Sequence, residues 1–348
     1  LLNRRPDMLE TIWFVLWGVL WTGYFVLDGF DLGLGSLMPF LARDDRERRL
    51  IFNAQGPFWD GNEVWLITAG GATFAAFPKT YAVMFSSLYT PLMLLLFALI
   101  LRGISFEMRS KETAAWWRNT WDACLVVGSF LAALLLGVAF ANIFKGLPLD
   151  ADGILHGDLL TLLNPYGLLG GALFVLLFGV HGSIWLAIKV EGELRERGAR
   201  MAARLWPVLL VVAVAFLGLT AVVTDLYVNI GRWPVLGVFP LLSVAGVLGT
   251  RLFLSKRAWW KAWASSAATI GGATALGIAG LYPRLLPSSL DPNATLTAFN
   301  SASSHLTLSI MLGVALVFVP IIVAYQVWVY RHFTFTISGE DVEKGNAY

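Results

Sequence analysis

Apolar runs of about twenty residues recur along the whole chain, and this recurrence limits the fold more than any other feature. As a helix, a run of this length spans the hydrocarbon core of a bilayer, at about 1.5 Å of rise per residue. In that core every backbone N–H and C=O must be bonded within the protein, which leaves only helices or closed barrels. The runs show no alternating strand pattern, so the sequence predicts an all-α, polytopic integral membrane protein.

The runs predict nine transmembrane helices, which we treat as a single transmembrane domain over residues 1–348. Composition agrees, because hydrophobic residues make up 57% of the chain and charged residues only 14%. The seventh run is short and carries Pro240, so an eight-span alternative with one hairpin that does not cross stays open. The candidate spans are residues 9–40, 51–76, 79–107, 117–146, 165–190, 204–229, 235–254, 259–283 and 304–332.

The distribution of basic residues predicts the orientation. Most of the 25 Lys and Arg residues fall in the loops after the first, third, fifth and seventh spans and in the C-terminal tail. The positive-inside rule places these segments in the cytoplasm, with the C-terminus inside and the N-terminus outside. Arg4 and Arg5 oppose this assignment, but they precede Met8, the natural start, and carry little weight.

Several kinds of site are excluded by residue counts and motifs. Cys124 is the only cysteine, which rules out a disulfide framework and a thiolate metal site. We expect His181 and His305, within or beside spans, to be packing residues, so no haem-ligand set is secure. Phosphate-binding loops, zinc-helix motifs and dinucleotide fingerprints are absent from the sequence, and no basic domain suggests nucleic acid.

Acidic residues inside the first two spans are the main functional signal. At spacings of three and four they share a helix face with aromatic residues and glycines. Pro57 should kink the second span by removing one backbone hydrogen bond. The face of the first span carries Trp17, Trp21, Tyr24, Asp28, Asp31 and Gly35, and that of the second carries Asn53, Gly56, Asp60, Glu63, Ile67 and Gly70.

Given the predicted orientation, these acids share the cytoplasmic half of the membrane. Placing an ionisable group inside a span costs several kcal/mol on most scales, which makes each one a functional hypothesis. The alternative is structural, with the acids paired to Arg102 or capping backbone groups beside Pro57. The ionisable residues predicted to gather in this half are Asp28, Asp31, Asp60, Glu63, Arg102, Glu107 and Asp122.

Several long segments resemble one family over almost the whole chain. They are "DGFDLGLG", "WDGNEVWLITAGGATFAAFP", "LRGISFEMRSK", "WRNTWD", "GSFLAALLLGVAFANIFKG", "LLNPYGLLGG" and "PSSLDPNATLTAFNSASSHLTL". In this order they resemble subunit II of the cytochrome bd-type quinol oxidases of bacteria and archaea. The segment "WDGNEVWLITAGGA" is long enough to be specific. The loop "DLYVNIGRWP" is shorter than in some members, so nothing is transferred there.

The resemblance implies a fold and a reaction. The fold would be two four-helix bundles plus a peripheral helix. The enzyme would oxidise quinol in the respiratory chain and reduce O2 to water electrogenically, with two b-type haems and haem d held by the partner subunit I. A small single-helix accessory subunit, bound lipid and a structural quinone would accompany the pair, in the cytoplasmic membrane. Nothing in the sequence decides between haem d and a b haem, or the type of quinone.

The resemblance also implies roles for individual residues. Asp60 would belong to a proton route from the cytoplasm, Glu107 would lie near its entrance, and Trp65 would lie beside a hydrophobic O2 passage. Around them we count Asp28, Asp31, Glu63 and Arg102 with the proton route. Two other functions stay open: a purely structural membrane subunit, and a secondary transporter, which would also carry acids at mid-membrane.

Overall fold

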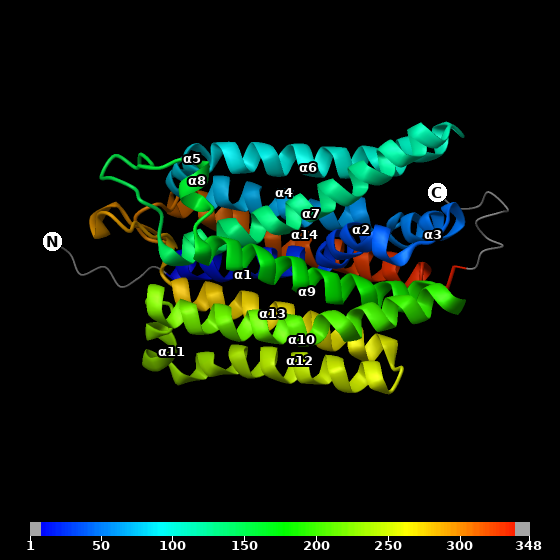
Figure 1. Ribbon diagram of the computed structural model, residues 1–348. Coiled ribbons are helices and arrows are strands. Elements are labelled where there is room, and N and C mark those ends of the chain that lie inside the picture. The colour runs from blue at the N-terminus through cyan, green and yellow to red at the C-terminus, as the bar shows by residue number, and fades with distance from the viewer. Residues whose placement is uncertain (1–7, 338–348) are drawn as a thin grey trace.

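Long helices lie side by side between two ends of the molecule (Figure 1). The computed structural model describes residues 8–337, and predictions about the tails, including Arg4, Arg5 and the C-terminal tail charge of Lys344, lie outside them. We call the end formed by residues 42–58, 107–122, 190–204 and 251–261 the basic end. The opposite end, formed by residues 77–79, 145–164, 224–237 and 282–304, is the loop end.

Helices account for nearly all of the regular structure, as the sequence predicts. Three 3-10 turns and two short strands complete it. In chain order the elements are α1 (Met8–Leu27), α2 (Gly29–Leu41), α3 (Asp45–Gln55), α4 (Trp59–Ala76), α5 (Pro78–Ser87), α6 (Tyr89–Met108), η1 (Arg109–Lys111), α7 (Ala115–Lys145), α8 (Leu159–Leu162), α9 (Pro165–Lys189), α10 (Gly192–Val223), α11 (Val228–Arg232), η2 (Pro234–Gly237), α12 (Val238–Ser255), α13 (Trp259–Leu281), β1 (Arg284–Leu286), η3 (Pro292–Ala294), β2 (Leu296–Thr297) and α14 (His305–His332).

Each of the first three predicted spans is two helices rather than one. The first breaks at Asp28, between α1 and α2, and the third breaks at Leu88, between α5 and α6. The second divides into α3 and α4 at residues 56–58, where Pro57 removes a backbone donor. The expected kink at Pro57 is therefore a full interruption of the helix.

Within residues 8–337, eight helical segments are long and apolar enough to cross a membrane. They include α1 and α2 taken together, and they cover eight of the nine predicted spans. The segment predicted as the second span is occupied by α4, which has 18 residues and packs along α1. Two acids and several small polar residues make α4 less apolar than the eight.

The helices pack as two groups with one helix outside them. In the first group α1 packs on α4 and α2, α2 packs on α7, and α7 packs on α6. In the second group α9 contacts α10 and α13, and α13 packs on α12. α9 also packs closely on α2 and α7, which joins the two groups. Since α14 buries only Leu308 and contacts α1 and α4, it is a peripheral helix. The arrangement matches the one that the family resemblance implies.

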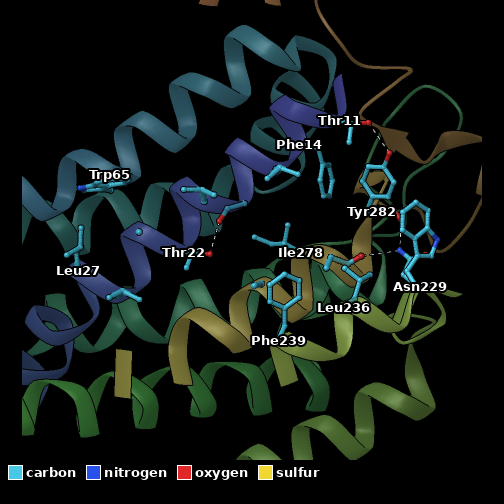
Figure 2. Close-up of a pocket in the computed structure, with 18 residues that line it drawn as sticks. Thr11, Phe14, Thr22, Leu27, Trp65, Asn229, Leu236, Phe239, Ile278 and Tyr282 are labelled. Carbon is cyan, nitrogen blue, oxygen red and sulfur yellow. Dashed lines mark hydrogen bonds between the residues drawn. The ribbon is translucent and has the colours of Figure 1, made fainter. Parts of the chain in front are cut away.

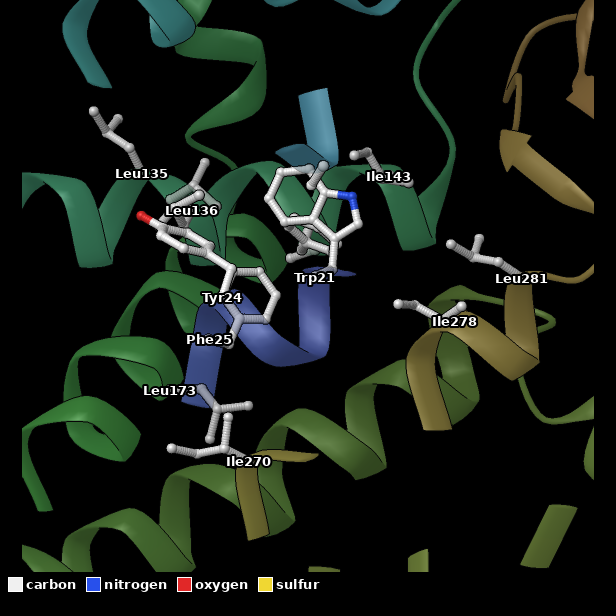
Figure 3. Packing of buried hydrophobic residues seen from close by; sticks show 14 of the residues in the cluster. Trp21, Tyr24, Phe25, Leu135, Leu136, Ile143, Leu173, Ile270, Ile278 and Leu281 are labelled. Carbon is white, nitrogen blue, oxygen red and sulfur yellow. The ribbon is translucent and has the colours of Figure 1, made fainter. Parts of the chain in front are cut away.

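Aromatic residues of α1 fill the space between the two groups (Figure 3). Trp21, Tyr24 and Phe25 are all less than 9% exposed and lie among side chains of α7, α9 and α13. The Trp21 ring meets the Phe140 ring edge to face, with 4.9 Å between centroids. Because lipid is as apolar as these side chains, tight packing rather than removal from water holds such helices together.

Glycines bring α2 and α9 into backbone contact. A Cβ built on Gly33 would lie 1.7 Å from the carbonyl oxygen of Phe178, and one on Gly182 would lie 2.4 Å from the Leu34 nitrogen. No side chain fits in either place. The two helices are thus held at the shortest separation their backbones allow, which fixes α2 and its acidic residue Asp31.

The loop end contains a two-stranded antiparallel ladder, β1 with β2, which the sequence does not predict. Beside it, Arg284 donates to both carboxylate oxygens of Asp225, at 2.8 and 2.7 Å. These hydrogen bonds hold the pKa of Asp225 below its usual range. The pair joins the loop after α10 to the loop after α13.

Candidate functional site

The junction between α1 and α2 places two carboxylates inside the helix bundle. Asp28 is the single residue between the two helices, and Asp31 lies in the first turn of α2. Both side chains are fully buried, as is Tyr24 one turn earlier. The whole predicted face of the first span, from Trp17 to Gly35, is buried. The sequence therefore identified this buried face correctly.

Arg102 of α6 is the cation of this buried cluster. Its guanidinium donates to Asp28 Oδ1 at 2.9 Å and forms an ion pair with Glu63 of α4. Asp31 Oδ2 lies 3.9 Å from the same guanidinium. Arg102, Asp28 and Asp31 have no exposed side-chain surface, and the Glu63 side chain is 20% exposed. The pairing with Arg102 that the structural alternative predicts is present.

Asn62 joins the cluster to the peripheral helix α14. Its Nδ2 donates to Asp31 Oδ2 at 2.7 Å and to the Leu27 carbonyl, which lies just before the helix break, at 3.0 Å. Its Oδ1 accepts from Gln326 at 3.1 Å and from the Tyr330 hydroxyl at 2.9 Å. Sequence reasoning missed these three polar residues, although Asn62 lies in the quoted "WDGN" segment and Gln326 interrupts an apolar run.

The cluster has more acceptors than donors. One guanidinium faces three carboxylates, and two carboxylate oxygens, Asp28 Oδ2 and Asp31 Oδ1, have no hydrogen-bond partner among the described residues. The Arg102 Nε donor also lacks one, and the Tyr24 hydroxyl lies beside the Asp28 carboxylate. Buried polar atoms of this kind are satisfied by water or by a proton in most proteins. In this buried site, one guanidinium thus faces three carboxylates.

Asp60 and Glu107 are exposed and lie outside the buried cluster. The sequence predicts Asp60 within one continuous second span, whereas the structure places it in the first turn of α4, three residues before Glu63. The predicted face from Asn53 to Gly70 was wrong, because the chain breaks before α4 and Ile67 is 73% exposed. Glu107 is exposed near the end of α6.

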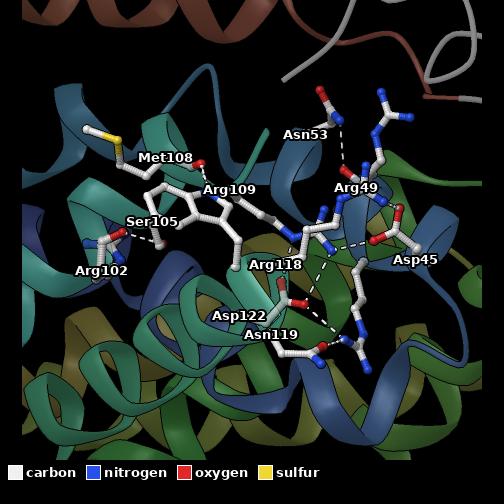
Figure 4. A network of polar contacts seen from close by, with 12 residues as sticks. Asp45, Arg49, Asn53, Arg102, Ser105, Met108, Arg109, Arg118, Asn119 and Asp122 are labelled. Atoms are coloured by element: carbon white, nitrogen blue, oxygen red, sulfur yellow. Dashed lines mark hydrogen bonds and ion pairs between the residues drawn. The ribbon is translucent and has the colours of Figure 1, made fainter. Parts of the chain in front are cut away.

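A second polar network, separate from the first, lies at the basic end (Figure 4). Asp122 of α7 accepts from Arg109 at 2.5 Å and from Arg48 at 2.9 Å. Asp45 accepts from Arg109 at 2.7 Å and from Arg118 at 3.1 Å. The predicted single gathering of acids is thus two groups, and Asp122 belongs to the one that joins α3, η1 and α7.

An apolar pocket of about 700 Å³ runs beside α1 (Figure 2). It is lined from Thr11 and Tyr282 near the loop end to Trp65 and Leu27, one residue before Asp28. The Trp65 ring packs on Gly23, and its Nε1 donates to Gln326 at 2.7 Å. Trp65 thus lies between the pocket and the hydrogen bonds of Asn62.

The two histidines within or beside spans differ in setting. His181 is buried, with Nδ1 2.6 Å from the Ser266 hydroxyl and Nε2 3.1 Å from the Val26 carbonyl. Both of its ring nitrogens are therefore engaged by the protein. His305 begins α14 and is exposed. In the part of the chain that the structure describes, no group of three or more His, Cys, Asp or Glu residues could hold a metal ion.

Comparison with known proteins identifies the family. Residues 9–333 match the family model described as cytochrome bd terminal oxidase subunit II. The chain is 38% identical to cytochrome bd-I ubiquinol oxidase subunit 2 of Escherichia coli (strain K12), with 97% of each chain covered. It is 36% identical to cytochrome bd ubiquinol oxidase subunit 2 of Bacillus subtilis (strain 168), over 96% of this chain and 98% of that one.

A solved structure shares the fold. It is described as the structure of bd oxidase from Geobacillus thermodenitrificans, and the superposition has a TM-score of 0.75 at 17% identity. The match covers 93% of this chain and 98% of that one. The family model and the two relatives each span nearly the whole chain. The chain therefore belongs to the family of cytochrome bd terminal oxidase subunits II.

Proposed function

We propose that this chain, as a single transmembrane domain, supports a haem-bearing subunit I and carries protons from the cytoplasm toward the site of O2 reduction. The names of its relatives specify ubiquinol, and we propose a quinol as the electron donor here. The haems, two of b type and one haem d, would belong to subunit I. His181 supports this division, because both of its ring nitrogens already have protein partners and neither is left to bind haem iron.

The observation that carries the proton proposal is the position of Asp60 relative to Glu63. Both lie on α4, three residues apart, so their side chains are neighbours on the helix surface. Asp60 is exposed, whereas Glu63 is mostly buried and paired with Arg102. A proton accepted at Asp60 thus has a short route to Glu63 and on to Asp28 and Asp31.

The exposed side of α4 also supports the proposed partner. Gly61, Gly70 and Gly71 have open space beside them, where a Cβ would meet no atom within 4 Å. Small residues let another helix approach closely, and a carboxylate such as Asp60 is costly against lipid. Both features favour a protein neighbour along α4, for which subunit I is the proposed occupant. We also propose a small single-helix accessory subunit, without assigning it a surface.

The test of the proton proposal is the variant Asp60→Asn in the purified two-subunit complex. Asparagine keeps the shape of the side chain but cannot exchange a proton. We expect full haem content with turnover slowed at least tenfold, and Asp60→Glu should retain more activity. Full haem loading with undiminished quinol-driven O2 consumption would instead favour a purely structural subunit.

We also propose that the basic end is cytoplasmic, as the positive-inside rule requires. Reporter fusions in the loop around Arg46 and after Arg331 should both report a cytoplasmic location. An external signal from either would reverse the orientation and, with it, the direction of the proton route. Glu107 lies at this end, which agrees with a place near the entrance.

Trp65 and the pocket beside α1 support an O2 passage. The pocket is lined almost entirely by apolar atoms, as O2 entry from lipid would require, and it ends one residue before Asp28. A structural quinone is the competing occupant. A second apolar pocket of about 720 Å³ between α9, α10 and α13 could also take an isoprenoid chain. The apparent KM for O2, measured after the pocket beside α1 is narrowed, separates an O2 passage from a quinone site.

A further inference from the structure

Unpaired positive charge is concentrated on one edge of the basic end. This edge, which we call the basic edge, is formed by the ends of α10, α12 and α13, at the lower right of Figure 1. All of its basic side chains are exposed. Its members are Arg200, Arg204, Arg251, Lys256, Arg257 and Lys261.

The rest of the basic end differs in its charge balance. Around α3, α6 and α7, arginines such as Arg48 and Arg109 are paired with Asp45 or Asp122 at 2.5–2.9 Å. On the basic edge, Arg257 pairs with Glu196 at 3.0 Å, and the other five have no acidic partner among the described residues. Topology alone requires basic residues at this end, but it does not require them to be unpaired on one edge.

The helices below the basic edge present apolar side chains to the membrane. On α10 these include Val208, Val211 and Val214, and on α12 they include Leu241 and Leu248, all 49–70% exposed. The Trp206 side chain of α10 donates to the Val247 carbonyl of α12 at 2.7 Å, which fixes the relative heights of the two helices.

The relative heights of α10 and α12 place Arg204 and Arg251 at a similar level along the helix axes. Arg204 lies two residues before Trp206, and Arg251 lies four residues after Val247. At about 1.5 Å per residue, the two Cα atoms lie roughly 3 and 6 Å beyond the Trp206–Val247 contact, toward the basic end. Exposed Trp260 lies on the same edge, and tryptophan is typical of the headgroup level of a membrane.

We propose that the basic edge binds the headgroup of an anionic phospholipid. Its phosphate would lie among Arg200, Arg204 and Arg251, and its acyl chains would follow the exposed apolar faces of α10 and α12. A charged group directly above an apolar surface fits an amphiphile better than a soluble anion or an acidic protein. Basic residues at the end of membrane helices attract such lipids through the same electrostatics.

The test uses the purified complex, exchanged into detergent with added phosphatidylglycerol or phosphatidylcholine of matched chains. Native mass spectrometry counts the lipids retained. The wild-type complex should retain phosphatidylglycerol in preference to phosphatidylcholine. The triple variant Arg200→Gln, Arg204→Gln, Arg251→Gln should lose that preference. The expected loss is about fivefold in affinity for phosphatidylglycerol per charge removed. Lys256, Arg257 and Lys261 stay in place to preserve topology, and an intact haem spectrum confirms assembly.

Two matched controls keep the proposal falsifiable. The variant with Lys79→Gln, Lys145→Gln and Arg232→Gln removes equal charge from the loop end and should retain the lipid preference. Replacing the three arginines of the basic edge by lysine should also retain it. Equal retention by the glutamine variant, or loss in the loop-end control, would overturn the proposal. Displacement by an equal concentration of inorganic phosphate would overturn the lipid assignment and leave a simple anion site.

Discussion

Removing the buried cation Arg102 gives the sharpest test of how the acidic cluster is held together. We choose Arg102→Met, because methionine is unbranched, apolar and able to fill part of the same space. The variant leaves Asp28, Asp31 and Glu63 without a counter-charge. We expect the complex to lose stability rather than merely to lose activity.

The expected loss of stability in Arg102→Met follows from how deeply each acidic partner of Arg102 is buried. Breaking a buried ion pair by removing one member costs about 3–5 kcal/mol, because a charge is left uncompensated. Asp28, fully buried and 2.9 Å from Arg102, should account for most of it. Glu63 is 20% exposed, and Asp31 keeps its hydrogen bond from Asn62, so each should add less. We therefore expect a total loss of about 4 kcal/mol.

The assay heats the complex to a series of temperatures. It then measures, by size-exclusion chromatography, the fraction that stays intact. Adding Asp28→Asn to Arg102→Met removes the stranded carboxylate and should recover about 2 kcal/mol, the coupling expected for groups in contact. The single variant Asp28→Asn completes the cycle. Our account fails if Arg102→Met behaves as wild type, or if the two single losses simply add.

Three further predictions concern other parts of the chain. Gly33→Ala should destabilise the complex by at least about 3 kcal/mol in the same heat assay, since its Cβ would overlap the Phe178 carbonyl, whereas Gly218→Ala, with no atom within 4 Å, should be neutral or mildly stabilising. Asp225, whose pKa is lowered by Arg284, should contribute stability above pH ~4 and lose it as pH falls through its folded pKa. Arg284→Gln should therefore lower the thermal midpoint at pH 6 by an amount worth up to about 1 kcal/mol, and the difference should shrink as pH falls through the folded pKa of Asp225; a difference that stays constant with pH would contradict the linkage. Narrowing the pocket beside α1 with Ala275→Phe should raise the apparent KM for O2 at saturating quinol, and an unchanged KM together with loss of bound quinone would favour a quinone site instead.

The length and spacing of the apolar runs, together with the composition of the chain, determine which parts of the fold could be predicted. Long apolar runs gave the helices and their order, because a bilayer leaves the backbone few alternatives. The positions at which helices break were less accessible. Pro57 indicates one interruption. Gly29 follows Asp28 and Pro91 lies three residues after Leu88, but neither marks the exact residue at which the helix is divided.

The buried cluster shows the same limit at the level of single residues. The face containing Asp28 and Asp31 was predicted correctly because it lies close to the period of a helix, on both sides of the break. The prediction for Asp60 assumed one continuous helix through residues 56–58, whereas the helix is interrupted there and Asp60 lies in the first turn of α4. Asn62 and Tyr330 are 268 residues apart in sequence and meet only through packing of α14 on α4, a contact that no local pattern contains.

The polarity of α4 has a consequence for how the chain enters the membrane during synthesis. α4 alone is less apolar than the eight segments that could cross unaided, and it carries Asp60 and Glu63. The counter-charge for Glu63, Arg102, is made about forty residues later, near the end of α6. Until α6 emerges from the ribosome, α4 has no partner for its buried acid. Stable insertion of α4 should therefore be delayed until α6 is available, so that α4, α5 and α6 enter the bilayer as one cooperative unit beside α1.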